Sequence, residues 1–145
     1  MRKLYLAHSS LSRVEVRKWQ KEVEKEIGIE FINPFHDFGD VESVKSVDEG
    51  RMTREEYVEH LNPAEIVEND CEAIIHSDGL VAIFDDTITY GTVMEVMVGC
   101  NCTDNPVFLI VTNGHHRNPW LRHHSDEIFI SKEAFVEYMK GREVG

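Results

Sequence analysis

The first third of the chain alternates between a short apolar run, a stretch of helical periodicity and a second apolar run. Residues 3–7, KLYLA, are rich in apolar and β-forming side chains and predict a buried strand. From about Ser12 to Ile27, apolar side chains recur at steps of three and four residues, which is typical of a helix with one buried side. Residues 29–35, IEFINPF, predict a second strand that Pro34 ends.

The next segment, residues 36–62, is polar and has few core-forming residues in register. A connection of this length inside a compact domain is usually a functional lid or a mobile loop. We therefore predict an irregular connection here, with helical character only in its later part.

The second half of the chain repeats the alternation of helix and strand. Pro63 suits the first turn of a helix that runs to about His76, and the apolar run at residues 79–84 predicts a strand buried on both faces. The other predicted elements are a helix at 92–101, a strand at 106–112, a short strand at 127–130 and a helix from Ser131 to Lys140. This order predicts an α/β fold, a flavodoxin-like or Rossmann-like doubly wound parallel sheet of about five strands, in a single domain over residues 1–145.

In such sheets, ligands bind outside the carboxyl ends of the strands, where the strand order reverses. Three polar stretches follow predicted strands and are expected to meet there: HSSLSR at residues 8–13, DDTITYGT at 85–92 and TNGHHRN at 112–118. Glu95 lies near the start of the helix that enters this region, and its neighbours in sequence are apolar. A carboxylate in apolar surroundings is costly unless it is paired, hydrogen-bonded or protonated. Glu95 is therefore a candidate for a functional role, and the alternative is a solvated acid that favours the helix dipole.

Composition narrows the functional classes. The 145 residues carry a net charge of -12, so extended binding to a nucleic-acid polymer is not expected, because phosphate contacts need Lys and Arg. No run approaches the roughly 18 apolar residues of a membrane span, and the N-terminus reads as a strand rather than a signal peptide. We expect a cytoplasmic protein without membrane contact. Its three cysteines form no even framework, which favours reduced thiols.

Several motifs, taken together, resemble one enzyme family. The stretches are KLYLAHSS at the N-terminus, ENDCEAIIHSDGLVAIFDD at residues 68–86 and YGTVMEVMVG at 90–99. With their spacing they resemble the nucleoside 2-deoxyribosyltransferase superfamily, which includes the 2'-deoxynucleoside 5'-monophosphate N-glycosidases. The residues that carry the resemblance are Tyr5, Asp70, Asp78, Gly91 and Glu95. Asp78 is expected to fix the turn before its strand.

The resemblance implies cleavage of the bond between a nucleobase and its sugar, with Glu95 as the carboxylate that attacks the anomeric carbon. Retaining glycosyl transfer requires such a nucleophile and a second group that protonates the leaving group. Asp70 is the best candidate for this general acid. Tyr5 is expected to donate its hydroxyl to Glu95. Alternatives remain open, because Asp70 also fits a surface acid and Tyr5 a core aromatic.

Substrate-binding candidates follow from the same comparison. In nucleotide-cleaving members the loop after the first strand holds the 5'-phosphate, which makes Ser9, Ser10, Ser12 and Arg13 the phosphate candidates, and capping of the helix by Ser12 the competing interpretation.

On the other side of the expected site, Gly91 opens the helix of Glu95. Thr89 stands where classical transferases of the family carry an Asp, which leaves open whether the sugar goes to a base or to water and whether the base is a purine or a pyrimidine. Asp85 and Asp86 either contact the base or cap the following turn.

The His-rich stretch at residues 115–124 lacks a matching Cys or acid, so we expect neither a metal site nor another cofactor. In family members the corresponding segment reaches a neighbouring subunit, and Asn118 and Trp120 would do so here. We therefore expect a homo-oligomer, a dimer or higher, that binds a nucleoside or nucleotide and a free nucleobase. Two other interpretations stay open: an NAD-cleaving hydrolase, and a non-catalytic nucleotide-sensing module.

Overall fold

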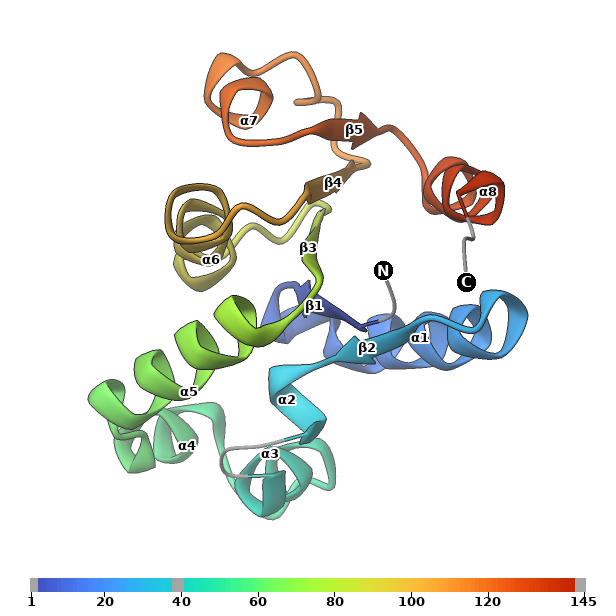
Figure 1. The fold of residues 1–145 in the computed structure, drawn as a ribbon. Helices are drawn as coiled ribbons and strands as arrows, with labels where there is room; N and C mark the ends of the chain where they lie inside the picture. The colour runs from blue at the N-terminus through green and yellow to red at the C-terminus, as the bar shows by residue number, and fades with distance from the viewer. Residues whose placement is uncertain (1–2, 38–40, 143–145) are drawn as a thin grey trace.

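The computed structural model describes residues 3–37 and 41–142, and the predictions that fall on residues 1–2, 38–40 and 143–145 lie outside the described part. Five parallel strands form one sheet in the order β2-β1-β3-β4-β5 (Figure 1). Their bounds are Lys3–Ala7 for β1, Glu30–Ile32 for β2, Gly79–Phe84 for β3, Val107–Val111 for β4 and Glu127–Phe129 for β5. This is the flavodoxin-like order, and the predicted fold class is confirmed.

Helices cover both faces of the sheet, as Figure 1 shows. On one face lie α1, Arg13–Ile27, and α8, Lys132–Gly141. On the other lie α5, Pro63–His76, α6, Tyr90–Cys102, and the short α7, Pro119–His123. None of the helices in the described ranges has the length and apolar character needed to cross a bilayer.

Side chains alternate between the two faces along each strand, which explains the two hydrophobic clusters. Leu4 and Leu6 of β1 pack with the α1 and α8 side, whereas Tyr5 and Ala7 pack with α5 and α6. Because both faces are covered, every residue of β3 and β4 is buried, as the continuous apolar runs predict. The sheet therefore presents Tyr5 to the helix that carries Glu95.

The segment predicted as an irregular connection is largely helical, which corrects the expectation for its earlier part, whereas helical character in its later part was predicted. It contains α2, Pro34–Asp37, α3, Val41–Asp48, and α4, Arg54–His60. Pro34, expected only to stop the preceding strand, begins α2. The helix α4 is stabilised by a reciprocal capping box between Thr53 and Glu56 rather than by a buried apolar face. Patterns of apolar residues do not detect helices of this kind.

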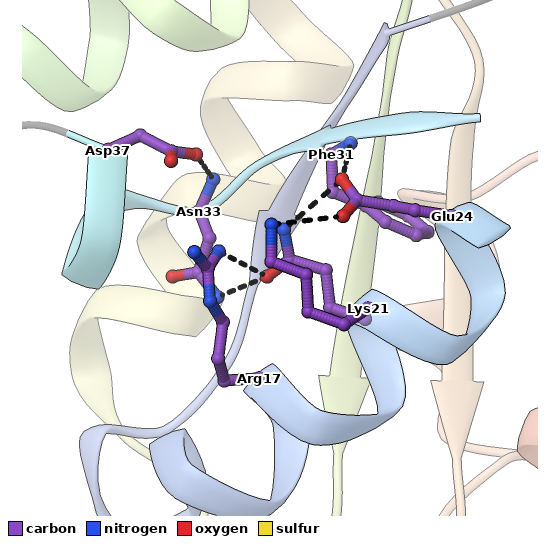
Figure 2. A network of polar contacts seen from close by, with 7 residues as sticks. Arg17, Lys21, Glu24, Phe31, Asn33 and Asp37 are labelled. Carbon is purple, nitrogen blue, oxygen red and sulfur yellow. Dashed lines mark hydrogen bonds and ion pairs between the residues drawn. The ribbon is translucent and has the colours of Figure 1, made fainter. Parts of the chain in front are cut away.

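A polar network closes the outer edge of β2 (Figure 2). The Phe31 amide donates to Glu24 Oε2 at 2.9 Å, and the Asn33 amide donates to Asp37 Oδ2 at 2.7 Å. Inside this edge, the fully buried Asn33 side chain donates to Gln20 Oε1 at 3.0 Å and accepts from the Phe35 amide at 3.1 Å. The end of β2 is therefore fixed by side chains rather than by a further strand.

Removing the Asn33 side chain should destabilise the protein, because the partly buried Phe35 amide would lose its acceptor and Gln20 Oε1 would lose one of its two donors. We expect Asn33→Ala to lower the free energy of unfolding by about 1–3 kcal/mol in urea denaturation. The matched control is Asn101→Ala on the exposed side of α6, which should change it by less than about 0.5 kcal/mol. Equal effects of the two substitutions would contradict a structural role for this network.

Candidate active site

Tyr5 and Glu95, which are 90 residues apart in sequence, meet at one hydrogen bond. Tyr5 lies in the central strand β1, is fully buried, and points to the face that α6 covers. Its hydroxyl donates to Glu95 Oε2 in a short hydrogen bond. The structure thus brings together the two residues that the sequence placed in one site.

The approach of α6 to the sheet makes this contact possible. Thr92, Val96 and Gly99 form the buried side of the helix. A Cβ atom at Gly99 would lie 3.2 Å from Leu80 Cδ1 and 3.4 Å from Val107 Cγ2, so glycine allows the close approach. Glu95 lies beside this buried side and is itself half-buried. Its carboxylate therefore reaches the end of the Tyr5 ring from a helix held against β3 and β4.

Burial raises the pKa of Glu95 to about 8, although the Tyr5 hydrogen bond acts in the opposite direction by favouring the ionised carboxylate. The negative charge of Asp70 contributes a further increase. A carboxyl group with this pKa is protonated in much of the free protein at neutral pH. The protonation state of Glu95 therefore depends mainly on burial and on nearby charges, and a charged ligand in the site would change it.

Asp70, in the middle of α5, belongs to the same electrostatic environment. Helix α5 packs against α6, and the charge of Asp70 acts on both Tyr5 and Glu95. Partial burial raises the pKa of Asp70 to about 6. The pKa of Tyr5 is raised as well, chiefly by burial and then by the two carboxylates, which keeps its hydroxyl protonated as a donor. Two carboxyl groups and one phenol thus form a coupled set.

The loop after β1 has a different hydrogen-bond pattern from the predicted one. Residues Ser10–Ser12 form a single 3-10 turn before α1. Ser9 is its cap and accepts from the Leu11 amide at 3.1 Å. Ser12 accepts no amide hydrogen bond as a cap, and its hydroxyl donates to the Ser9 carbonyl at 3.2 Å. Capping of α1 by the Ser12 side chain is therefore wrong.

Arg13, predicted to contact phosphate, is occupied by the protein itself. Its guanidinium forms an ion pair with Asp48 of α3, and its Nη1 donates to the Ser10 carbonyl at 2.5 Å. Close by, Arg54 of α4 donates to the Ser10 hydroxyl at 3.4 Å. The loop after β1 therefore has two arginine neighbours, of which the sequence singled out only one.

The loop after β3 is organised by its first acid. Asp85 Oδ1 accepts from the Thr87 amide at 2.8 Å and from the Thr87 hydroxyl at 2.7 Å, while the Asp85 carbonyl accepts from the Asn113 side chain at 3.0 Å. Asp85 thus caps this turn, whereas Asp86 is exposed.

Two further predicted positions open α6. Thr89 lies within hydrogen-bond distance of the Thr92 hydroxyl, 3.0 Å away, at the start of the helix. Gly91, in the first turn, is exposed, with open space where a Cβ would stand. Both therefore lie ahead of Glu95 on its own helix.

The hydrogen bonds of Asn118 do not involve Tyr5 or Glu95. Its Oδ1 accepts from the Trp120 and Leu121 amides and so caps α7, and its side chain is otherwise exposed. In residues 3–37 and 41–142, no group of three His, Cys, Asp or Glu side chains is placed to hold a metal ion. Asp78 accepts from the Lys3 amide at 2.9 Å, as expected for a residue that fixes the turn before β3.

Sequence reasoning missed His8, which is buried directly after β1. Its Nδ1 lies 3.0 Å from the Ser9 carbonyl and its Nε2 lies 3.3 Å from Asn33 Oδ1, so both ring nitrogens face oxygen atoms. Burial lowers the pKa of His8. A histidine directly after a buried strand was the available signal. It links the loop after β1 to the network at the end of β2.

A hollow lies beside the polar network at the edge of β2, and neither Glu95 nor Asp70 lines it. It has a volume of about 700 Å³ and lies along the outer edge of β2, where Gln20, Glu24 and Phe31 line it. Neither Tyr5 nor Glu95 lines this hollow. The candidate active site is therefore assigned from its chemistry and not from cavity size.

The whole fold is similar to that of three solved structures. A conserved protein from Enterococcus faecalis V583 matches with a TM-score of 0.70 at 17% identity, over 99% of both chains. A 2-deoxyribosyltransferase from the psychrotolerant bacterium Bacillus psychrosaccharolyticus matches with a TM-score of 0.67 at 19% identity, over 94% of this chain and 91% of that one. A CMP N-glycosidase from Clostridium botulinum matches with a TM-score of 0.58 at 14% identity, over 98% of this chain and 100% of that one.

Similarity at these identities concerns the fold. No protein-family model matches the sequence, and no curated protein matches it either. The resemblance to the nucleoside 2-deoxyribosyltransferase superfamily, which the sequence motifs indicate, is confirmed at the level of the fold, because the chain folds as a 2-deoxyribosyltransferase and a CMP N-glycosidase do.

Proposed function

We propose that this protein cleaves the N-glycosidic bond of a nucleoside, of the ribo or 2'-deoxy series, or of its 5'-monophosphate. The sugar passes through a covalent ester on Glu95 to another base or to water. The observation that carries the proposal is the Tyr5 hydroxyl bound to Glu95 Oε2, with Asp70 in the same electrostatic environment. The two enzymes of similar fold, a 2-deoxyribosyltransferase and a CMP N-glycosidase, support this choice of reaction.

In the first step, Glu95 attacks the anomeric carbon while the bond to the base nitrogen breaks. Because Tyr5 occupies Oε2, Oε1 is the oxygen that forms the ester. The bonding electrons leave with the base nitrogen, which takes a proton from Asp70 directly or through a water. Tyr5 stays protonated and holds the carboxylate in one orientation.

In the second step, the Asp70 carboxylate accepts a proton from water or from the N–H of an incoming base. That nucleophile attacks the anomeric carbon, the ester bond breaks, and the Glu95 carboxylate is restored. Thr89, at the start of α6, is our candidate for a neutral hydroxyl that contacts the base, and the acceptor is either water or a second base. We infer that Asp86, exposed after β3, contacts the base, since Asp85 is committed to its turn.

The proton distribution of the free site differs from the one that the reaction needs. With pKa values near 8 for Glu95 and 6 for Asp70, a singly protonated site holds its proton mainly on Glu95. The reactive form has the proton on Asp70 and is the less populated of the two singly protonated forms, because Glu95 has the higher pKa. Positive charge that develops on the sugar favours the ionised Glu95 carboxylate, so substrate promotes the shift of this proton.

We also infer that copies of this chain associate through α6. Its exposed side carries a row of apolar side chains in which each is at least 40% exposed: Tyr90, Val93, Met94 and Met97. These positions repeat at helical spacing, so they form one exposed apolar stripe along the helix. A second copy would cover this row next to Glu95, and Asn118 is our candidate for a residue that reaches the partner's site.

Replacing the nucleophile should abolish base release without unfolding the protein. Glu95→Gln retains the shape and an acceptor for Tyr5, but an amide does not form the glycosyl ester. We expect no detectable release of base from deoxynucleosides or deoxynucleotides, followed by chromatography, while the circular dichroism spectrum stays unchanged. Substantial activity in this variant would rule out the covalent route.

The dependence of kcat/KM on pH should be bell-shaped. We expect kcat/KM to peak between pH 6 and 8. It falls below about 6 because both carboxyl groups become protonated and no nucleophile remains, and above about 8 because both ionise and no acid remains. Asp70→Asn should lower kcat by ~10²–10⁴-fold and remove the bell shape. A profile that is flat from pH 5 to 9 would contradict the roles of this pair.

Association through α6 predicts that a charge in its apolar row disperses the oligomer. Met94→Glu should sediment as a monomer at micromolar concentration, where wild type sediments as a dimer or larger species, because burying an unpaired carboxylate is costly. The control is Val58→Glu on α4, which is similarly exposed and should leave the assembly intact. A monomeric wild type would refute the proposed assembly.

A further inference from the structure

His8 is buried where the segments that follow three strands meet. It comes directly after β1 and is only 3% exposed. Its ring contacts that of Phe35 in α2, with 5.0 Å between the ring centroids, and the Asp85 carboxylate after β3 lies within electrostatic reach. The ring therefore lies at the carboxyl ends of the strands, beside the candidate site, and neither step of the proposed reaction uses it.

The direction of the hydrogen bonds around His8 follows from the outer end of the polar network. Arg17 is always a donor there, and the Glu24 carboxylate is an acceptor. Gln20 lies between them: its Oε1 accepts from Arg17 Nη1 at 3.2 Å, and its Nε2 donates to Glu24 Oε2 at 3.3 Å. This fixes the orientation of the Gln20 amide, because the opposite orientation would bring two donors together at one end and two acceptors at the other.

The same reasoning fixes the orientation of the Asn33 amide. Its Nδ2 donates to Gln20 Oε1 at 3.0 Å, and its Oδ1 accepts from the Phe35 amide at 3.1 Å. The atom that lies 3.3 Å from His8 Nε2 is Oδ1, which is an acceptor. His8 Nε2 must therefore carry a proton in order to form a hydrogen bond with Asn33.

The other ring nitrogen of His8 faces an acceptor as well. Nδ1 lies 3.0 Å from the Ser9 carbonyl oxygen, which can only accept. The same oxygen accepts from the Ser12 amide and from the Ser12 hydroxyl, both at 3.2 Å, so it anchors the 3-10 turn before α1. A neutral imidazole has one N–H and satisfies one of the two oxygens, whereas the imidazolium satisfies both.

The groups around His8 act on its charge in both directions. Burial lowers the pKa of His8 most, and His36 of α2 lowers it further. Three partners oppose this: the Ser9 carbonyl, the Asn33 side chain and the Asp85 carboxylate. The pKa of His36 is itself lowered, by burial and then by Arg17 on α1. The other charged groups that act on His36 are Asp37, Asp48 and Arg13. His8 therefore takes up its second proton in mildly acidic solution, below the usual pKa of histidine.

We propose that His8 is a positioning residue of the candidate active site, and that its imidazolium fastens the loop after β1 to the end of β2. When the ring loses one proton, one of the two bonds is lost, and the loop after β1 is no longer held to Asn33. A loop that is already held in place loses less conformational entropy when substrate binds. The charged ring therefore favours binding. The inference deepens the proposed function and rests on it for the substrate that the loop meets.

The charge of the ring is measured in the free wild-type protein. Two-bond proton–nitrogen correlation spectra report which ring nitrogens carry a proton, and His8 is assigned as the signal that His8→Gln lacks. We expect both nitrogens of His8 to be protonated at about pH 5 and one of them at about pH 8. The Phe35 and Ser12 amide signals should shift with the same midpoint. A ring that stays neutral over this range, or amides that do not follow it, would overturn the proposal.

Binding shows whether the fastened loop matters to the site. In the Glu95→Gln background, the four common deoxynucleosides and their 5'-monophosphates are titrated by calorimetry. We expect His8→Gln, which takes no charge, to weaken binding about 3- to 10-fold at about pH 5 and by less than about twofold at about pH 8. Asp70 also titrates in this range, but its contribution is common to both proteins. With Glu95 restored, His8→Gln should raise KM at about pH 5 and leave kcat within about twofold, because the bond between Tyr5 and Glu95 is unchanged.

The matched control is His76→Gln. His76 is an exposed histidine on α5 whose Nδ1 donates to the Glu72 carbonyl at 2.8 Å, so neither binding nor its pH dependence should change. An equal loss of affinity at both pH values in His8→Gln would mean that the side chain only fills space, and the positioning role would be refuted. If no deoxynucleoside or nucleotide binds or releases its base while the ring and the two amides titrate together, the proposed function fails and the proton-dependent link between the two segments stands.

Discussion

A single, partly buried hydrogen bond, from Tyr5 in the centre of the sheet to Glu95 on α6, holds the candidate site together. It spans the interface between sheet and helix, where a carboxylate without a donor would be costly. Close contact of Gly99 with Leu80 keeps α6 near enough for this bond. The packing of α6 against the sheet therefore also sets the geometry of the site. A small shift of α6 would break the hydrogen bond between Tyr5 and Glu95 while the fold stays intact.

Burial also gives the carboxyl pair its particular state. Glu95 is more buried and is held by Tyr5, whereas Asp70 lies on a neighbouring helix with more access to solvent. The more buried carboxyl is the weaker acid, and the free protein stores its proton on the group that must later be ionised. The ionised nucleophile is thus a form that ligand binding must favour.

Much of the fold could be predicted from the sequence, because β3 and α5 carry strong local signals: a fully apolar run, and Pro63 at the first turn. The order of the parallel strands placed Glu95 at the carboxyl ends of the sheet, and the resemblance to the family implied that Tyr5 donates to it. The helices α2 and α3 were missed, whereas α4 falls in the later part of the segment, where helical character was predicted. No residue of α4 is buried, and its capping box leaves no apolar period. The pairing of Arg13 with Asp48 and the order of the two carboxyl pKa values depend on tertiary burial, which one sequence does not display.

The outer edge of β2 is closed to the addition of another strand. Its Phe31 and Asn33 amides already have carboxylate acceptors from α1 and α2, so an incoming strand would find no donors at these positions and would meet two negative charges. Growth of the sheet by strand addition at this edge is thereby blocked. At this edge, the carboxyl ends of the strands and the candidate site beside them therefore stay clear of a continuous intermolecular sheet.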